Sequence, residues 1–253
     1  MFYNGANCDI YIGKGAGKKL LDDMRNARKS IKIVSPYLSP SLVNELIYFK
    51  ERNLEVDLVT TGDFGDLYGI NEKNIHQLIL QNRETDNVAL EKRNKWKNIS
   101  RVLTYIALGL LTVLSGIAYY LKDVIVAFGL IPIAILFFVI KHYKYRIKSK
   151  RIFSYWYSQL FPFKVYLNNY AGIRSTTFVH SKIYLIDDEI AYLGSLNFTN
   201  SGTKYNYETR IRTVDSYAIK EIKEEINQLM NRTDLPDRDI QFWGKQLYSE
   251  PIN

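Results

Sequence analysis

The chain has 253 residues, of which 47% are hydrophobic, and a formal net charge of +8. This length and composition allow a buried core and exclude a disordered polymer, while a single cysteine, Cys8, excludes an intrachain disulfide and a cysteine-rich zinc site. The positive charge favours a polyanionic partner, which can be nucleic acid, an anionic membrane surface or a phosphate-bearing substrate.

The N-terminal part alternates between short strands and helices. Because MFYNGANCDIYIG lacks a basic leader followed by an apolar run, we expect no signal peptide. The glycine-rich stretch 13–19 lacks the full phosphate-loop spacing and is interpreted as a strand-to-helix turn. Strands are expected at 9–12, 31–35 and 55–60, and helices at 16–30 and 40–52. This order is typical of parallel strands joined by crossover helices.

Two uncharged runs, 102–120 and 124–140, dominate the middle of the sequence. A loop after Thr61 and a polar helix over 74–100 are expected to lead into them. As helices, each run is roughly 26 to 28 Å long, close to the hydrocarbon thickness of a bilayer. Both runs are apolar on every face, which favours a transmembrane hairpin over the alternative of a hairpin buried in a soluble core.

Lysine and arginine residues flank both ends of this hairpin. By the positive-inside rule, the hairpin is expected in the inner (plasma) membrane with both flanks, both termini and the catalytic domain on the cytoplasmic side. Much of the net charge would then face phospholipid, which weakens the inference from charge to nucleic acid.

Soluble-type elements resume after the hairpin. A helix end is expected at 153–160, strands at 164–168, 177–186, 190–194 and 207–213, and a helix at 217–230. The simplest organisation is one α/β domain interrupted by the hairpin: 1–73 as its N-terminal part, 74–101 as a stalk, 102–140 as the hairpin, 141–163 as a return stalk and 164–253 as its C-terminal part.

A group of polar residues near the end of the chain indicates phosphoryl chemistry. His180 and Lys182 are two apart in a predicted strand, so they share a face and place a proton carrier beside a cation. Gly194 allows a turn close to a ligand, and Ser195 and Asn197 offer a hydroxyl and an amide to phosphate oxygens. A lone strand histidine is more often a core residue, but the combination favours a site. No spacing indicates a metal site, and no cofactor is predicted.

These residues carry a family resemblance. HSK at 180–182, Asp187 and GSLN at 194–197 resemble the HxKxxxxDxxxxxxGSxN signature of the phospholipase D superfamily, and GSLNFT looks most like its bacterial single-motif nuclease branch. The resemblance implies an α/β sandwich with a central mixed sheet flanked by helices. Glu208 lies where family members carry a glutamate near the catalytic histidine.

The resemblance also implies a mechanism. His180 would attack phosphorus without a metal ion, Lys182, Ser195 and Asn197 would hold the nonbridging oxygens, and Glu208 would orient an imidazole. Asp187, which completes the set of candidate catalytic residues, is expected to be a structural anchor more than a proton carrier. Family members build one active site from two motifs, so a chain with one motif predicts a homodimer.

Three substrate hypotheses remain open. The single motif and several basic residues favour an endonuclease on DNA or RNA; those residues are Lys14, Lys18, Lys19, Lys204, Arg210 and Arg212. The hairpin and the aromatic residues between Tyr155 and Phe163 favour a phospholipid-cleaving or phosphatidyl-transferring enzyme, of phospholipase D or cardiolipin synthase type. A catalytically inactive membrane scaffold is the third. We rank the nuclease first.

Overall fold

The computed structural model describes residues 4–62, 76–122, 124–167, 169–170, 173–174 and 179–253. The loop expected after Thr61 and the start of the strand expected at 177–186 lie outside these residues. The chain divides into two units, considered separately below. The sheet unit comprises Met1–Gln81 and Tyr157–Tyr248, and the hairpin unit comprises Asn82–Trp156 and Ser249–Asn253.

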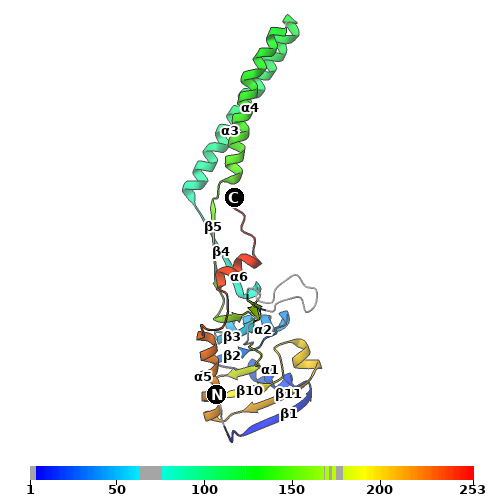
Figure 1. The fold of residues 1–253 in the computed structure, drawn as a ribbon, viewed down its shortest axis with the longest axis vertical. Coiled ribbons are helices and arrows are strands. Elements are labelled where there is room, and N and C mark those ends of the chain that lie inside the picture. The colour runs from blue at the N-terminus through cyan, green and yellow to red at the C-terminus, as the bar shows by residue number, and fades with distance from the viewer. Residues whose placement is uncertain (1–3, 63–75, 123, 168, 171–172, 175–178) are drawn as a thin grey trace. The chain divides into compact units, whose positions relative to one another are not determined.

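A seven-stranded mixed sheet forms the centre of the sheet unit, in the order β1-β11-β10-β9-β2-β3-β6 (Figure 1). Its strands are β1 (Cys8–Lys14), β2 (Ser30–Val34), β3 (Glu55–Thr61), β6 (Phe163–Tyr166), β9 (Ile183–Ile186), β10 (Ile190–Gly194) and β11 (Tyr207–Thr213). β2, β3 and β6 are mutually parallel, whereas the other pairs are antiparallel. The predicted α/β fold with a central mixed sheet is confirmed.

The expected run of parallel strands from the N-terminus is correct for β2 and β3 and wrong for β1. β1 forms the edge of the sheet and pairs only with β11, in antiparallel orientation. Its side chains Ile10 and Ile12 are 66% and 59% exposed. A strand that is exposed at nearly every position suits an antiparallel edge, whereas central parallel strands are buried on both faces, as β2 is.

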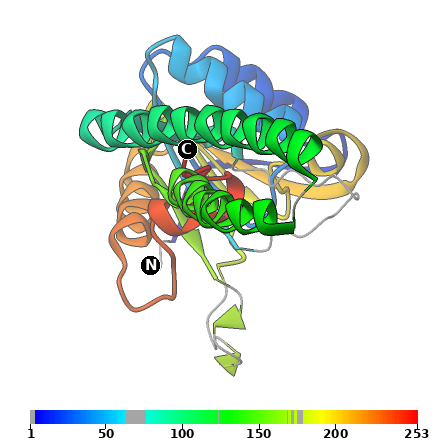
Figure 2. The same ribbon diagram turned by 90° about the horizontal axis from the view of Figure 1, so that it is seen from above.

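Helices cover both faces of this sheet (Figure 2). α1 (Gly17–Arg25) and α2 (Pro40–Glu51) bury Leu20, Leu46 and other apolar residues in one cluster with Tyr184 of β9. α5 (Ser216–Asn231) buries Ile222 and Ile226 in a second cluster, on the opposite face. A final helix, α6 (Ile240–Leu247), was not predicted.

The hairpin unit contains the two apolar helices. α3 (Asn87–Leu121) is a 35-residue helix, and η2 (Val124–Gly129) and α4 (Leu130–Ser149) form the return arm, so the first turns of the second predicted run are 3-10 rather than α-helical. Only 6% and 11% of the most apolar windows are buried, which does not fit a hairpin buried in a soluble core. Length and composition alone are weak evidence for association with a membrane.

Two predicted helical segments beside the hairpin are strands instead. β4 (Ile79–Thr85) follows the short η1 (His76–Leu78) and replaces part of the helix expected at 74–100, and β5 (Phe153–Gln159) replaces the helix end expected at 153–160. The two pair as a two-stranded sheet. A second small pair joins β7 (Asn169–Tyr170) and β8 (Ile173–Arg174). Such pairing depends on long-range contacts that local periodicity does not report.

Candidate active site

His180 and Lys182 lie together immediately before β9, in irregular backbone rather than in the predicted strand. The Lys182 Nζ atom is 3.0 Å from His180 Nδ1 and 2.9 Å from Nε2, and it donates a hydrogen bond of 2.7 Å to the His180 carbonyl oxygen. Lys182 is only 6% exposed, whereas His180 is exposed. A buried ammonium group is therefore held against a solvent-accessible imidazole.

Ser195 and Glu208 form a second linked pair, where β10 turns towards β11. The Ser195 hydroxyl donates to Glu208 Oε2 and accepts a hydrogen bond of 3.0 Å from the Thr209 backbone N–H. Glu208 is 7% exposed and also accepts a hydrogen bond of 3.1 Å from Asn206 Nδ2. A buried carboxylate thus fixes the orientation of the Ser195 hydroxyl.

Gly194 makes the approach of these two strands possible. Its φ angle is +153°, and a Cβ atom there would lie 2.0 Å from the carbonyl oxygen of Thr209. Any side chain would push β10 away from β11 and displace Ser195. The glycine of the signature is therefore required by backbone packing.

Asn197 lies in the 195–198 loop, which is held by Ser35, directly after β2, and by Tyr184 of β9. The Phe198 N–H donates to Ser35 Oγ at 2.9 Å, and the Tyr184 hydroxyl donates to the Leu196 carbonyl at 2.7 Å. The Asn197 Oδ1 atom is buried and has no hydrogen-bond partner within the part of the chain that the structure describes. An unsatisfied buried amide oxygen costs about 1–3 kcal/mol and can only accept a hydrogen bond, so a ligand that satisfies it must supply a donor.

The electrostatics of the site centre on Lys182. Burial lowers the pKa of Lys182, because the ammonium form loses solvation, and the negative charge of Glu208 acts in the opposite direction. The two buried groups are thus electrically coupled, and a change at Glu208 is transmitted to the cation.

This coupling predicts a pH effect. Loss of the Lys182 proton should produce an alkaline limb in the kcat/KM profile below the ordinary lysine pKa of about 10.4. Glu208→Gln removes the charge that raises the Lys182 pKa, so the limb should move to lower pH. Lys182→Arg should move it upward. Initial rates on bis(p-nitrophenyl) phosphate across the alkaline range measure this, and an unmoved limb in Glu208→Gln would contradict the coupling.

Asp187 lies at the other end of β9, roughly 13 Å along the strand from the Lys182 end, and is not part of this cluster. Its carboxylate accepts backbone hydrogen bonds of 2.9 Å from Arg28, 2.7 Å from Lys29 and 2.9 Å from Ser30. Burial alone would raise the pKa of Asp187, but these bonds outweigh it and hold the pKa below its usual range. They also explain why the predicted helix does not continue to Ser30.

Asp187→Ala is therefore expected to lower the free energy of unfolding by about 2–4 kcal/mol, since three backbone donors lose a charged acceptor. The contribution is present above the unfolded pKa of about 3.9 and is lost as pH falls through the lower folded pKa. Chemical denaturation of the purified protein measures it. Glu189→Ala is the control, because Glu189 makes only an exposed ion pair of 3.4 Å with Lys29 and should change stability by less than about 1 kcal/mol.

The six basic residues considered for polyanion binding fall into two groups. Lys19 and Arg212 contact the buried Asp23 at 2.7 and 3.1 Å, and Arg210 donates to the Ala16 carbonyl at 2.9 Å, so all three side chains already have partners within the domain, although Lys19 is 54% exposed. The other three are exposed and form no ion pair among the described residues: Lys14, Lys18 and Lys204.

Sequence analysis missed three residues that position the site: Asn206, Ser35 and Tyr184. Asn206 could have been found from its place two residues before Glu208, because side chains two apart share a face. Ser35 and Tyr184 act on the 195–198 loop through tertiary contacts, for which the sequence gives no local signal.

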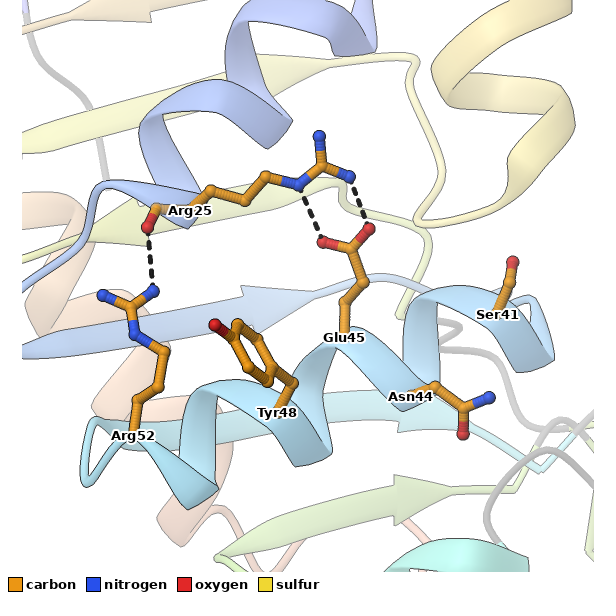
Figure 3. A pocket seen from close by; sticks show the side chains of 6 residues that line it. All are labelled: Arg25, Ser41, Asn44, Glu45, Tyr48 and Arg52. Atoms are coloured by element: carbon orange, nitrogen blue, oxygen red, sulfur yellow. Dashed lines mark hydrogen bonds and ion pairs between the residues drawn. The ribbon is translucent and has the colours of Figure 1, made fainter.

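A surface cavity of about 460 Å³ lies apart from these residues, between α1 and α2 (Figure 3). Its charged groups are already paired: Arg25 contacts Glu45 at 2.5 Å, and Arg52 donates to the Arg25 carbonyl at 2.8 Å. Among the residues that the structure describes, no group of three or more His, Cys, Asp or Glu side chains could hold a metal ion.

Comparison with known proteins identifies one family model that matches part of the chain. A model described as the phospholipase D-like domain of cardiolipin synthase matches residues 135–230, a range that contains all six candidate catalytic residues. Cardiolipin synthase A from Pseudomonas fluorescens (strain SBW25) is 37% identical over 57 residues, which cover 21% of this chain and 12% of that protein. The chain thus spans a small part of this relative's length.

Solved structures with similarity to the chain include NucT and Nuc. NucT from Helicobacter pylori is 12% identical with a TM-score of 0.49, over 92% of this chain and 100% of NucT. Nuc from Salmonella typhimurium, described as a phospholipase D family member, is 14% identical with a TM-score of 0.44, over 92% of this chain and 99% of Nuc.

Proposed function

Because the chain belongs to the phospholipase D superfamily, we propose that it is a phosphodiesterase that acts through a covalent phosphohistidine at His180 and needs no metal ion. The observation that carries this proposal is the buried Lys182 ammonium held within hydrogen-bonding distance of the exposed His180 ring. An imidazole beside a fixed cation is suited to attack on an anionic phosphodiester.

The proposed reaction has two steps. A ring nitrogen of His180 bonds to phosphorus while the bond to the leaving oxygen breaks, and that oxygen takes a proton from His180 of the partner subunit. Water then attacks phosphorus, the P–N bond breaks, and the partner's imidazole accepts the water proton. Lys182, the Ser195 hydroxyl and the Asn197 amide hold the nonbridging oxygens, and Glu208 orients Ser195. Each chain has one motif and contributes one of the two histidines that the reaction needs, so we propose a homodimer.

We favour nucleic acid as the substrate. The exposed Lys14, Lys18 and Lys204 are free of ion pairs in the described region. A polymer of phosphates would contact such residues beyond the bond that is cleaved, whereas a lipid carries only a headgroup.

A phospholipid is the second candidate, and a different observation favours it. Both apolar helices expose most of their surface, and the matching domain model and the relative both take their names from cardiolipin synthase. Phosphatidyl transfer would follow the same first step, with an alcohol in place of water in the second. A catalytically inactive scaffold is a weaker alternative, since every residue of the signature is present.

We also propose that the hairpin spans the inner membrane with both ends on the cytoplasmic side. Basic residues on both flanks support this orientation. They are Lys92, Arg93, Lys95, Lys97 and Arg101 before the hairpin, and Lys141, Lys144, Arg146, Lys148, Lys150 and Arg151 after it.

One experiment separates these functions. The full-length protein in detergent is incubated, in excess chelator, with labelled single- and double-stranded nucleic acid and with phosphatidylglycerol or cardiolipin vesicles. We expect cleavage of nucleic acid. Turnover of lipid alone would reverse the ranking, turnover of neither would support a scaffold, and loss of activity only when chelator is present would contradict the metal-independent mechanism.

A further inference from the structure

We propose that a basic pocket in the hairpin unit binds the headgroup of an anionic phospholipid. The pocket has a volume of about 360 Å³ and lies on the surface of the paired helices α3 and α4 (Figure 1). We name it the headgroup pocket. Its lining includes Lys97, Ser100, Arg101, Thr104, Tyr105 and Lys144. The inference rests on the proposed membrane span and adds to it a site for one class of lipid.

Three cations from two helices line the headgroup pocket. Lys97 and Arg101 are four residues apart on α3, so their side chains share one face of that helix, and Lys144 comes from α4. The described residues that line the pocket include no aspartate or glutamate, and none of the three cations takes part in an ion pair of the described chain. The pocket therefore concentrates positive charge that an anionic ligand would neutralise.

This charge lies at the boundary of the apolar helices. Arg101 directly precedes the uncharged run 102–120, and Lys144 follows the run 124–140 by four residues. Tyr105 lies in the first turn of the apolar run and is 67% exposed. Basic and tyrosine side chains are typical of the layer where a bilayer meets water. In a hairpin that spans the membrane, the pocket would thus lie at the depth of the lipid phosphates on the cytoplasmic side.

Contacts between the two helices fix the shape of the pocket. Ser100 is buried where α3 packs, and a small side chain at this position allows the helices to approach closely. The Arg146 Cζ atom lies 4.4 Å from the centre of the Trp96 ring. Arg93 donates a hydrogen bond of 3.3 Å to the carbonyl oxygen of Ile147, which also lines the pocket. The cations of the two helices are therefore held beside one another before a ligand binds.

The surface beyond the pocket favours a phospholipid as the occupant. Immediately after Tyr105 the apolar surface of α3 begins, and Ile106 and Leu108 are both exposed there. A phospholipid matches this order, with its phosphate beside the cations and its acyl chains along the apolar helix. A free phosphate gains nothing from the apolar part of the surface, and a nucleic acid has no apolar segment to place against it.

Lipid binding to the full-length protein tests the proposal. The His180→Ala protein, used to prevent turnover, is titrated in neutral detergent with short-chain phosphatidylglycerol, and native mass spectrometry gives the Kd of the tightest bound lipid. The triple change Lys97→Gln, Arg101→Gln and Lys144→Gln should weaken this binding about 30-fold or more, because each cation attracts the anionic headgroup. Phosphatidylcholine, which has no net charge, should bind the protein without the triple change about 10-fold more weakly than phosphatidylglycerol does.

The matched control is the triple change Lys95→Gln, Lys141→Gln and Lys148→Gln. It removes the same number of exposed charges from the same two helices, but none of these lysines lines the pocket, so phosphatidylglycerol binding should stay within about threefold. Unchanged binding in the pocket variant, an equal loss in both triple variants, or equal binding of phosphatidylcholine would overturn the inference. Displacement of the lipid by an equal concentration of inorganic phosphate would also overturn it, because the site would then recognise a free anion.

Membrane insertion is measured separately, by alkaline carbonate extraction of membranes that contain the native protein. If the native protein resists extraction while the pocket variant binds phosphatidylglycerol normally, only the inference fails. Release of the native protein by carbonate would instead refute the proposed membrane span.

Discussion

Replacing His180 with alanine is expected to lower kcat/KM for a phosphodiester by about 10⁴-fold or more, while the protein still folds and its hairpin is unchanged. The exposed ring is the only part of the cluster that can form a covalent bond to phosphorus under the proposed mechanism, and nucleophile removal costs this much in other covalent enzymes. Rates on nucleic acid and on bis(p-nitrophenyl) phosphate measure the loss. Circular dichroism checks the fold.

His142→Ala is the matched control. His142 is an exposed histidine of α4 and belongs to the hairpin unit, so its removal should leave kcat/KM within about twofold. Lys182→Ala should also abolish turnover, since it removes the cation that contacts the His180 ring. A His180→Ala protein with native activity would eliminate the covalent mechanism.

A heterodimer of one native chain and one His180→Ala chain is expected to be nearly inactive, not half active. The mechanism uses two imidazoles at one phosphorus atom, one as nucleophile and one as proton carrier, and each chain provides a single one. Loss of the proton carrier alone should reduce kcat by about 100-fold or more. Co-expression of the two chains with different affinity tags, followed by sequential purification, isolates the mixed dimer for assay.

The native chain paired with His142→Ala serves as the control and should keep full activity. Half of the native rate in the His180→Ala heterodimer would mean that each chain carries a complete, independent site. A native enzyme that sediments as a monomer while active would also refute the shared site.

Two strands beside the candidate site were predicted accurately, whereas the strand expected to contain His180 and Lys182 begins only at Ile183. β10 and β11 have the predicted bounds, 190–194 and 207–213, because short runs between turn residues define them locally. The proximity of His180 to Lys182 likewise depends on two residues in nearly adjacent positions. The link between Ser195 and Glu208 was not predicted, because the family resemblance implied that Glu208 orients an imidazole.

Elements that depend on distant partners were mispredicted. β1 finds its partner β11 about 200 residues away, and β5 pairs with β4 across the whole hairpin. The predicted helix does not reach Ser30, because the Asp187 carboxylate, from a distant part of the chain, accepts the backbone N–H groups of Arg28, Lys29 and Ser30. Helical and strand periodicity do not depend on such contacts and so cannot predict them. The contacts of Ser35 and Tyr184 with the 195–198 loop could not be predicted for the same reason.

Direct trapping of the intermediate tests the central claim most sharply. The native protein is mixed with a slowly cleaved phosphodiester, quenched with alkali to preserve phosphohistidine, digested and analysed by mass spectrometry. We predict a substrate-derived phosphoryl adduct on the peptide that contains His180, at the His180 ring, and its absence in His180→Ala. Efficient turnover with no adduct at any time, or an adduct confined to another residue, would contradict covalent catalysis by His180.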